Sequence, residues 1–282
     1  MAEGHAVARW ADALQALVGE TVAEVAVPRR WEARAAELLG ASVTGVRAHG
    51  KHLVLTFSVP WIIHAHAMQY GSWQIGMRGI SPRKERRYVR LHLVTTSHEA
   101  FYFHGPVMEV LSPDEFAAYE RFQTLGPDLL HEGFDETAAA IRVRASGIRE
   151  IGDVIVDQRV VAGVGNIYKS EGLFLAGIHP WHPARRVPLD QLRTMFRELV
   201  PLMQAGRRRF GATVTVPDEV HAERGVRNWV YRRRGAPCLK CGTAIEMGRQ
   251  GTLKRMVFFC PLCQKAQPVS RKAKNSVFPR PL

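Results

Sequence analysis

Four cysteines, the only ones in the chain, stand in two short pairs near its end: Cys238 with Cys241 and, after eighteen intervening residues, Cys260 with Cys263. Two Cys-x-x-Cys pairs at this separation are the ligand pattern of a tetrahedral structural zinc site, in which each pair forms one knuckle. A pair of disulfides is the alternative, but short-spaced pairs in a chain without a secretory signal disfavour it. The pattern therefore predicts one structural zinc ion per chain, bound by all four cysteines.

The residues between the two knuckles predict a small hairpin. Segments 243–247 and 256–259 alternate or run apolar like two strands, and a glycine-containing turn at 248–251 separates them. Lys254 and Arg255 stand at the start of the second strand, so the hairpin presents positive charge to solvent. We expect a negatively charged partner to meet this tip.

The charge of the whole chain agrees with such a partner. The 282 residues include 39 Lys and Arg against 26 Asp and Glu, a net charge of +13. This surplus indicates a polyanion, nucleic acid first of all, although a protein can also be basic without binding one. No apolar run approaches the length of a membrane span, and Glu3, Arg9 and Asp12 spoil a secretory signal. We therefore expect a soluble, cytoplasmic, nucleoid-associated monomer with no membrane partner.

Residues 1–112 predict a β-rich first domain. Apolar residues at helical spacing predict a helix over 6–18, ended by Gly19, and a second helix lies at about 31–39. β-Branched and aromatic residues in partial alternation predict strands over 43–57, 61–68, 70–77, 88–96 and 100–111. The expected architecture is a sandwich or flattened barrel with two helices.

Two turns of this domain carry candidate functional residues. Gly50-Lys51 lies between two strands, where a lysine is ordinarily a solvated turn residue. The sequence Met68-Gln69-Tyr70-Gly71 ends in a turn-forming glycine, so its large side chains are expected to be exposed rather than in the core. Large exposed side chains on a basic protein can wedge into a stack of bases. His64 and His66 share one strand face, where polar-face histidines are a more common explanation than a metal site.

The chain from 113 to 230 predicts a helical second domain. Ser112, Pro113 and Glu115 form the start of a helix with a capping box. Helices are expected at about 113–122, 137–145, 148–157, 166–176 and 189–205, while 211–228 shows few signals of order. Two glycines in 160–165 permit tight turns, and Asn166 is expected to cap the next helix, which makes either a phosphate site or a simple connector. The finger then occupies 231–267, and 268–282 is a basic tail.

Four separated motifs make nearly the whole chain resemble the formamidopyrimidine-DNA glycosylase and endonuclease VIII family of base-excision repair enzymes. They are the start Met1-Ala2-Glu3-Gly4, the Gly50-Lys51 turn, the segment from Asp157-Gln158 through Gly163-Val164-Gly165-Asn166 to Glu171, and the finger, whose Arg255 precedes the third cysteine by five residues. The third motif is similar to the family's helix–two-turn–helix. The turn after His66 and the segment 125–128 resemble the endonuclease VIII branch. The resemblance implies an α+β multidomain protein: an N-terminal β-sandwich with two helices, a C-terminal helical domain with the helix–two-turn–helix, and a zinc-finger hairpin.

The resemblance also implies an activity. The protein would be a bifunctional DNA glycosylase and DNA-(apurinic or apyrimidinic site) lyase that acts on damaged or abasic DNA, excises a damaged, oxidised base and cleaves the strand by elimination. After removal of Met1, the Ala2 amine would form a Schiff base with the sugar, since an α-amino group is partly neutral near pH 7. Glu3 would serve as the acid and base, and Lys51 would position the phosphates and assist proton transfer.

The same resemblance assigns the DNA contacts. Asn166 and Arg255 would clamp the phosphates around the extruded nucleotide, Arg255 also belonging to the catalytic set. Met68, Gln69 and Tyr70 would fill the gap that the nucleotide leaves.

The chain departs from the family pattern at several positions. Ala2 replaces the usual proline nucleophile, Ala6 replaces a second glutamate, and Thr124 stands where an arginine often contacts DNA. The wedge sequence Met-Gln-Tyr replaces Gln-Leu-Tyr. The alternative function is therefore a catalytically weak or inactive relative that binds damaged or distorted DNA through its zinc finger. A ribosomal or RNA-binding zinc protein would explain the charge and the finger, but not the N-terminus.

Overall fold

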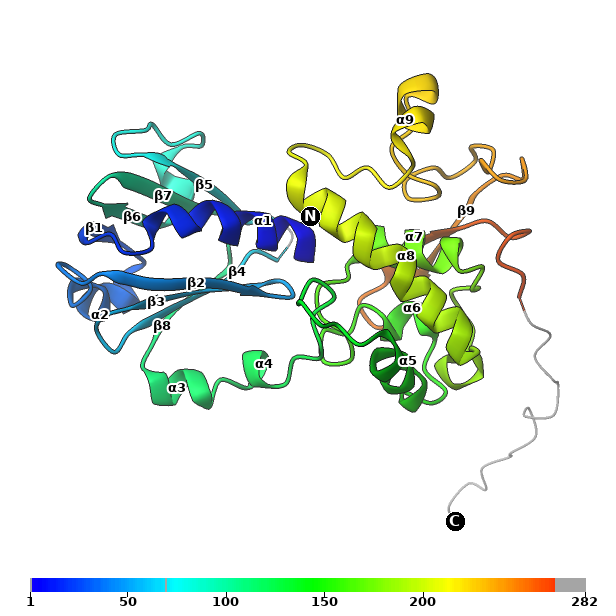
Figure 1. The fold of residues 1–282 in the computed structure, drawn as a ribbon, viewed down its shortest axis with the longest axis horizontal. Coiled ribbons are helices and arrows are strands. Elements are labelled where there is room, and N and C mark those ends of the chain that lie inside the picture. Colours follow the sequence, from blue (N-terminus) through cyan, green and yellow to red (C-terminus); the bar gives the residue numbers. More distant parts are fainter. Residues whose placement is uncertain (1, 69, 267–282) are drawn as a thin grey trace, which may run out of the picture.

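The computed structural model describes residues 2–68 and 70–266, and they form two lobes joined by a connector (Figure 1). The first lobe is built mainly from strands and the second mainly from helices, with the finger on the outer side of the second lobe. This confirms the predicted α+β class. The predicted basic tail, 268–282, lies outside the described residues.

Two four-stranded antiparallel sheets form the first lobe. One sheet has the order β1-β6-β7-β5 and the other the order β2-β3-β4-β8. The strands are β1 (Val22–Ala26), β2 (Val43–His49), β3 (His52–Phe57), β4 (Ile62–His66), β5 (Ser72–Met77), β6 (Val89–Thr95), β7 (His98–Phe103) and β8 (Val107–Leu111). Their inward-facing apolar residues pack together with helix α1 (Gly4–Leu14) in one core. A short helix α2 (Glu32–Ala36) completes the sandwich with two helices that the sequence predicts.

The connector begins with the predicted capping box. Ser112 Oγ accepts a hydrogen bond from the Glu115 amide, and the Glu115 carboxylate accepts one from the Ser112 amide, at the start of α3 (Pro113–Ala117). Helix α4 (Glu120–Gln123) follows. The second lobe contains α5 (Glu136–Ala145), α6 (Ile151–Val154), α7 (Asn166–Leu175), α8 (Leu189–Arg208) and α9 (Asp218–Arg224). The long helix α8 packs against α5 and α7 of its own lobe and against α1 of the first lobe, so it contacts both lobes.

The finger carries a two-stranded antiparallel hairpin, β9 (Glu246–Gln250) and β10 (Arg255–Phe259). The predicted position of its turn was wrong by about three residues, because Gly248 and Gln250 belong to β9 and the turn occupies 251–254. Gly248 lies within the strand and packs against Trp181. A glycine is needed there because a Cβ would stand 2.5 Å from the indole ring. The glycine thus signals close packing and not chain reversal.

Further elements differ from the sequence expectation. The helix expected over 113–122 is two short helices, α3 and α4, and the helix expected over 148–157 is shortened to α6. The single strand expected over 100–111 is two strands, since His104 takes a positive φ of 54° and turns the chain between β7 and β8. Strand β1 is not among the expected strands, the first of which begins at residue 43. Helix α9 lies within 211–228, where the sequence shows few signals of order. Within the described part of the chain, no helix is long and apolar enough to cross a membrane.

Candidate active site

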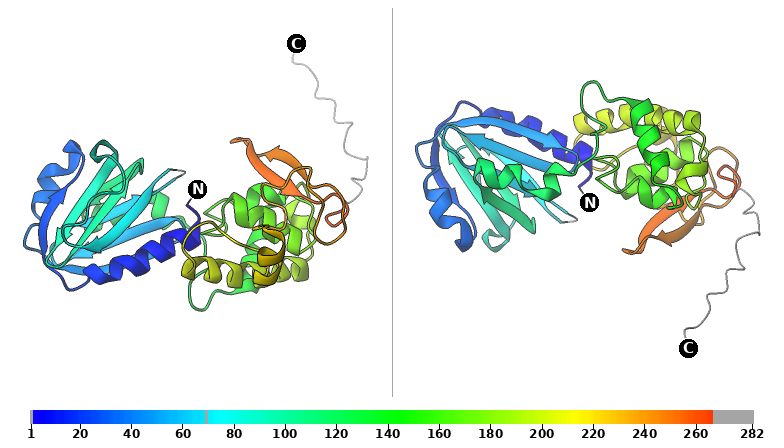
Figure 2. Two further views of the ribbon diagram at one scale, coloured as in Figure 1. Left: turned by 90° about the horizontal axis from the view of Figure 1, so that it is seen from above. Right: turned by 90° about the horizontal axis from the view of Figure 1, so that it is seen from below.

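The N-terminal arm meets the second lobe through glycines that allow two backbones to touch. The Gly4 amide donates to the Gly163 carbonyl at 2.8 Å, and a Cβ on Gly4 would lie 2.8 Å from Gly163 Cα. A Cβ on Gly165 would lie 2.4 Å from the Glu3 side chain. Only glycine permits this approach. The first residues of the chain are thereby fixed against the start of α7, and Figure 2 shows the N-terminal end at the junction of the two lobes.

Glu3 is fully buried and occupies the N-terminus of α7. Its carboxylate accepts hydrogen bonds from the amides of Gly165 at 3.1 Å, Ile167 at 2.8 Å and Tyr168 at 3.3 Å. Burial raises the pKa of the Glu3 carboxyl, and this outweighs the lowering by Lys51 and by the three amides. A carboxyl with a raised pKa is suited to donate and accept protons near neutral pH.

Lys51 lies near this carboxyl, and Arg255 lies near Lys51. Burial lowers the pKa of Lys51, the charge of Glu3 opposes this and the charge of Arg255 adds to it, so that the pKa is about 8. Lys51 reaches this position from the β2–β3 turn, whose Gly50 amide donates to Asp128 at 2.7 Å across the lobes. Arg255 comes from the first residue of β10. Lys51 therefore interacts electrostatically with both Glu3 and Arg255.

Ala2 is buried, with 8% of its surface exposed, and belongs to the core of the first lobe. Its position in the chain puts its backbone nitrogen next to Glu3. An N-terminus that begins at this residue would therefore be held by packing on one side and by the fixed glutamate on the other.

Asn166 differs from the sequence expectation in two ways. It is the first residue of α7 and not its cap, which is Gly165, and only 7% of it is exposed. The amides at the start of α7 are bound by Glu3, which comes from more than 160 residues away. Sequence reasoning misses this because the cap is supplied by tertiary structure.

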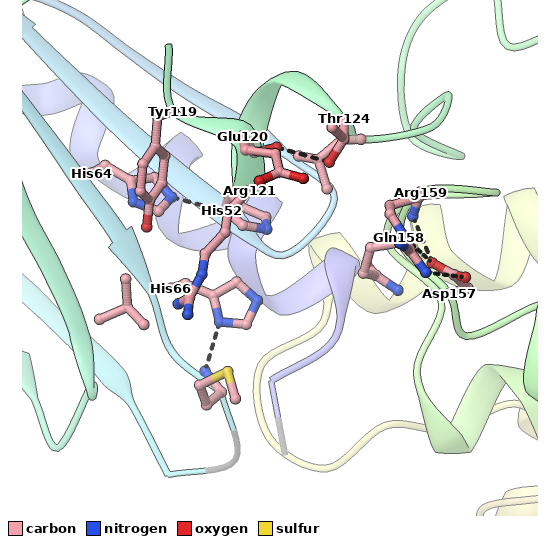
Figure 3. A pocket seen from close by; sticks show the side chains of 13 residues that line it. His52, His64, His66, Tyr119, Glu120, Arg121, Thr124, Asp157, Gln158 and Arg159 are labelled. Atoms are coloured by element: carbon pink, nitrogen blue, oxygen red, sulfur yellow. Dashed lines mark hydrogen bonds and ion pairs between the residues drawn. The ribbon is translucent and has the colours of Figure 1, made fainter. Parts of the chain in front are cut away.

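The turn that carries Met68 and Tyr70 is exposed, as predicted. Met68 is 52% and Tyr70 74% exposed, and Met68 has a positive φ of 49°. Gln69 lies outside the described residues. We refer to Met68-Gln69-Tyr70-Gly71 as the wedge turn. It borders a cavity of about 510 Å³ between the lobes, which is also lined by three histidines and by residues of the connector and of the segment before α7 (Figure 3).

The four cysteines converge in the finger. The Sγ atoms of Cys238 and Cys263 are 3.9 Å apart and those of Cys241 and Cys260 are 3.5 Å apart. All four sulfurs lie within 4.8 Å of one another, and the cysteines form no disulfide. The group can hold a metal ion, and the disulfide alternative is excluded.

Two buried charged residues of α7 were not singled out from the sequence. Glu171 accepts hydrogen bonds from the amides of Trp229, Val230 and Tyr231 at 2.8–3.0 Å, and so ties the chain before the finger to α7. The Lys169 ammonium is fully buried and has no hydrogen-bond partner in residues 2–68 and 70–266. Burial and, after it, the charge of Arg255 lower its pKa to about 8. No local sequence pattern predicts the burial of either residue, because it depends on how the finger and the chain before it pack on α7.

Comparison with known proteins places this geometry in a family. The N-terminal domain of formamidopyrimidine-DNA glycosylase matches residues 1–107, and the H2TH domain of that enzyme matches residues 125–218. A probable endonuclease 8 of Streptomyces coelicolor is 32% identical, over 99% of this chain and 100% of the relative. A DNA-(apurinic or apyrimidinic site) lyase of Mycolicibacterium smegmatis is 35% identical, over 94% of this chain and its own full length.

The fold is also similar to that of a solved formamidopyrimidine-DNA glycosylase. The formamidopyrimidine-DNA glycosylase of Lactococcus lactis, solved in complex with DNA containing an abasic site, superposes with a TM-score of 0.77 over 94% of this chain and all of its own, at 23% identity. The match extends through both lobes and the finger. The chain therefore belongs to the formamidopyrimidine-DNA glycosylase and endonuclease VIII family.

Proposed function

We propose that this protein is a base-excision repair DNA glycosylase with DNA-(apurinic or apyrimidinic site) lyase activity. The observation that carries the proposal is the buried Glu3 carboxyl, fixed by three amides of α7 next to the chain's first residues and near Lys51. A buried carboxyl with a raised pKa beside an amine is suited to acid–base catalysis with a covalent intermediate. Such a buried charged group lowers the stability of the fold, so it is typical of functional sites. The full-length likeness to a lyase and to endonuclease 8 relatives supports the same reaction class.

The reaction uses the Ala2 amine that removal of Met1 exposes. Its nitrogen lone pair attacks the sugar C1′, the bond from C1′ to the damaged base breaks, and the base leaves with the bonding electrons. Glu3 gives its proton to the ring oxygen as the ring opens, and an imine forms between C1′ and the Ala2 nitrogen. The imine acidifies C2′, loss of a C2′ proton forms a double bond, and the 3′ phosphate departs by elimination.

The other predicted residues serve DNA binding in this proposal. Lys51, Arg255 and Asn166 hold phosphates around the extruded nucleotide. Met68 and Tyr70, with Gln69, insert where the nucleotide leaves the stack, in keeping with their exposure in the wedge turn. Damaged or abasic DNA is the partner, and the net charge of +13 supplies the electrostatic attraction.

The finger holds one structural zinc ion in this proposal. In a tetrahedral site with zinc–sulfur bonds of about 2.3 Å, neighbouring sulfurs stand about 3.8 Å apart. The Cys238–Cys263 and Cys241–Cys260 separations of 3.9 and 3.5 Å fit that geometry. Zinc would hold the two knuckles together and so fix β10 and its Arg255. We also propose the division into residues 1–112, 113–230 and 231–267.

A borohydride trapping experiment tests the nucleophile. Wild-type protein with Met1 removed should form a covalent adduct with abasic DNA, and peptide mapping should place it on residue 2. A form that retains an extra residue before Ala2 should give no adduct. Lys51→Ala should still trap, with slower turnover. An adduct on Lys51, or full activity with an acetylated N-terminus, would overturn the assignment.

A further inference from the structure

Three histidines of the first lobe lie together at the cavity beside the wedge turn (Figure 3). In the antiparallel pairing of β3 with β4, His52 stands opposite His66, and Val54 stands opposite His64. His64 is therefore the diagonal neighbour of His52, and all three side chains share one face of the sheet. The opposite face, with Leu53, Leu55 and Ile63, packs into the core.

The His52 ring contacts both of the other rings. His52 Nδ1 and His64 Nε2 are 2.8 Å apart and share a hydrogen bond, and the His52 and His66 rings have centroids 4.5 Å apart. Phe122 of the connector packs edge-on against both His52 and His64. Tyr119 packs against His64 in the same way. The connector thus covers the His52–His64 pair and leaves His66 at its edge, toward the wedge turn.

Burial keeps these imidazoles neutral. It lowers the pKa of His66 to about 4 and those of His52 and His64 further, and the charges of Lys51 and Arg121 near the cluster act in the same direction. A neutral imidazole has one donor and one acceptor nitrogen. The Met68 amide donates to His66 Nδ1 at 3.3 Å, so this nitrogen is the acceptor and the proton lies on Nε2. The hydrogen bond joins His66 to the residue of the wedge turn whose φ is positive.

His64 has a single polar anchor. It is fully buried, and its Nδ1 has no hydrogen-bond partner among the residues that the structure describes. A buried polar atom without a partner costs free energy, so a leucine of similar size would fill this place at lower cost to stability. The hydrogen bond to His52 is what a histidine provides at this position and a leucine would not. We therefore look for a role of this bond other than stability.

We propose that His52 and His64 are positioning residues for base extrusion: their hydrogen bond fixes the ring of His52, which supports His66, which in turn holds the Met68 amide at the start of the wedge turn. The inference rests on the proposed function for the role of the wedge turn. It assigns the pair no contact with DNA, because both rings lie under the connector. The pair matters for substrates whose nucleotide must be expelled from a duplex, and not for the chemistry at Ala2 and Glu3.

Matched substitutions of His64 test the proposal. His64→Leu removes the hydrogen bond and keeps the volume, whereas His64→Gln places an amide where Nε2 stands and keeps the bond to His52. Thr44→Val is the control, since it removes a 3.0 Å hydrogen bond to Thr56 on the outside of the same sheet. Thermal unfolding of each variant shows whether the fold is retained.

Two readouts separate positioning from chemistry. The first is the fluorescence of 2-aminopurine placed next to a non-cleavable abasic analogue in a duplex, which rises when the wedge inserts and needs no catalysis. The second is single-turnover cleavage of abasic DNA, in duplex and in single strands. His64→Leu should insert and cleave in the duplex about tenfold more slowly, the effect of losing one buried hydrogen bond. It should cleave the single strand at the wild-type rate, and His64→Gln and Thr44→Val should resemble the wild type in every assay.

The outcomes of these assays are distinct. Unchanged insertion in folded His64→Leu, an equal loss on single strands, or a His64→Gln variant as defective as His64→Leu would each overturn the positioning role. If the wild type cleaves nothing, the proposed catalytic function fails. The fluorescence comparison of His64→Leu with His64→Gln then still shows whether the His52–His64 pair has a positioning role.

Discussion

At the scale of single residues, Glu3 joins two roles that usually exclude each other. It binds the amides at the start of α7 as a carboxylate would, yet burial raises its pKa and favours the protonated form. The amides therefore fix its position while the low polarity of its surroundings provides the proton. This is the requirement for an acid that must protonate the sugar oxygen in one defined place.

Glu3→Gln separates these two roles. The amide oxygen of glutamine can still accept from the Gly165 and Tyr168 amides, which bind one and the same carboxylate oxygen of Glu3, but the side chain has no acidic proton. We expect release of a damaged base to fall at least about 100-fold, the lower end of the usual effect of general acid–base catalysis. Cleavage at a preformed abasic site should fall less, because no base remains to be expelled. Single-turnover rates on the two substrates measure this; equal losses would contradict the assignment.

Lys51 makes DNA binding depend on pH. Its pKa of about 8 in the free protein means that the charge is present below this pH and is lost above it. A bound phosphate raises the pKa, so binding above pH 8 takes up a proton and the affinity falls as pH rises. The slope approaches a tenfold loss of affinity per pH unit for one proton. Lys51→Arg, which stays charged, should flatten this slope in titrations at pH 7–9.5; an unchanged slope would exclude Lys51 as its source.

At the scale of elements, the sequence predicts those features that depend on residues close together in the chain. The capping box at Ser112, the β2–β3 turn at Gly50 and the two cysteine knuckles all follow from residues a few positions apart. The capping of α7 by Glu3 and the closeness of His52 to His64 do not, since both depend on how distant segments pair. The sequence places Glu3, Lys51 and Arg255 in one site only through the family resemblance. Lys169 stays hidden because nothing in its neighbours shows that it will be buried.

Metal binding should determine the stability of the finger and not that of the first lobe. Cys260 is fully buried and packs in a small core with Phe258 and Tyr231, so loss of the metal should unfold this core. We expect one zinc per chain in fresh protein, and Cys260→Ser should lose the zinc and most DNA affinity while the first lobe stays folded. Leu262→Ser is the control, since Leu262 is half exposed between two ligands and should keep the zinc. Less than about half a zinc per chain in the wild type would contradict the site.

At the scale of the whole molecule, the two lobes and the finger each contribute to one positively charged site. Lys51 comes from the first lobe, Lys169 and Asn166 from α7, and Arg255 from the finger. The contacts that join these parts include Gly4 on Gly163, Gly50 on Asp128, and Glu171 on the chain before the finger. The strength of phosphate binding is therefore a property of the assembled lobes, and none of the parts supplies it alone.

Asn166→Ala and Arg255→Ala should consequently weaken DNA binding without changing what is recognised. Phosphate contacts carry no base information, so the affinity for lesion-containing and undamaged duplexes should fall by the same factor. Loss of the Arg255 charge should also reduce the slope of log affinity against log salt by about 0.9, the value for one phosphate. Arg193→Ala removes an equal charge from an ion pair with Asp190 on α8 and should leave both quantities unchanged. Binding titrations at several salt concentrations measure all three variants. A variant that kept its affinity but altered its preference for the lesion would show that its side chain reads the base, and the proposed phosphate clamp would be wrong.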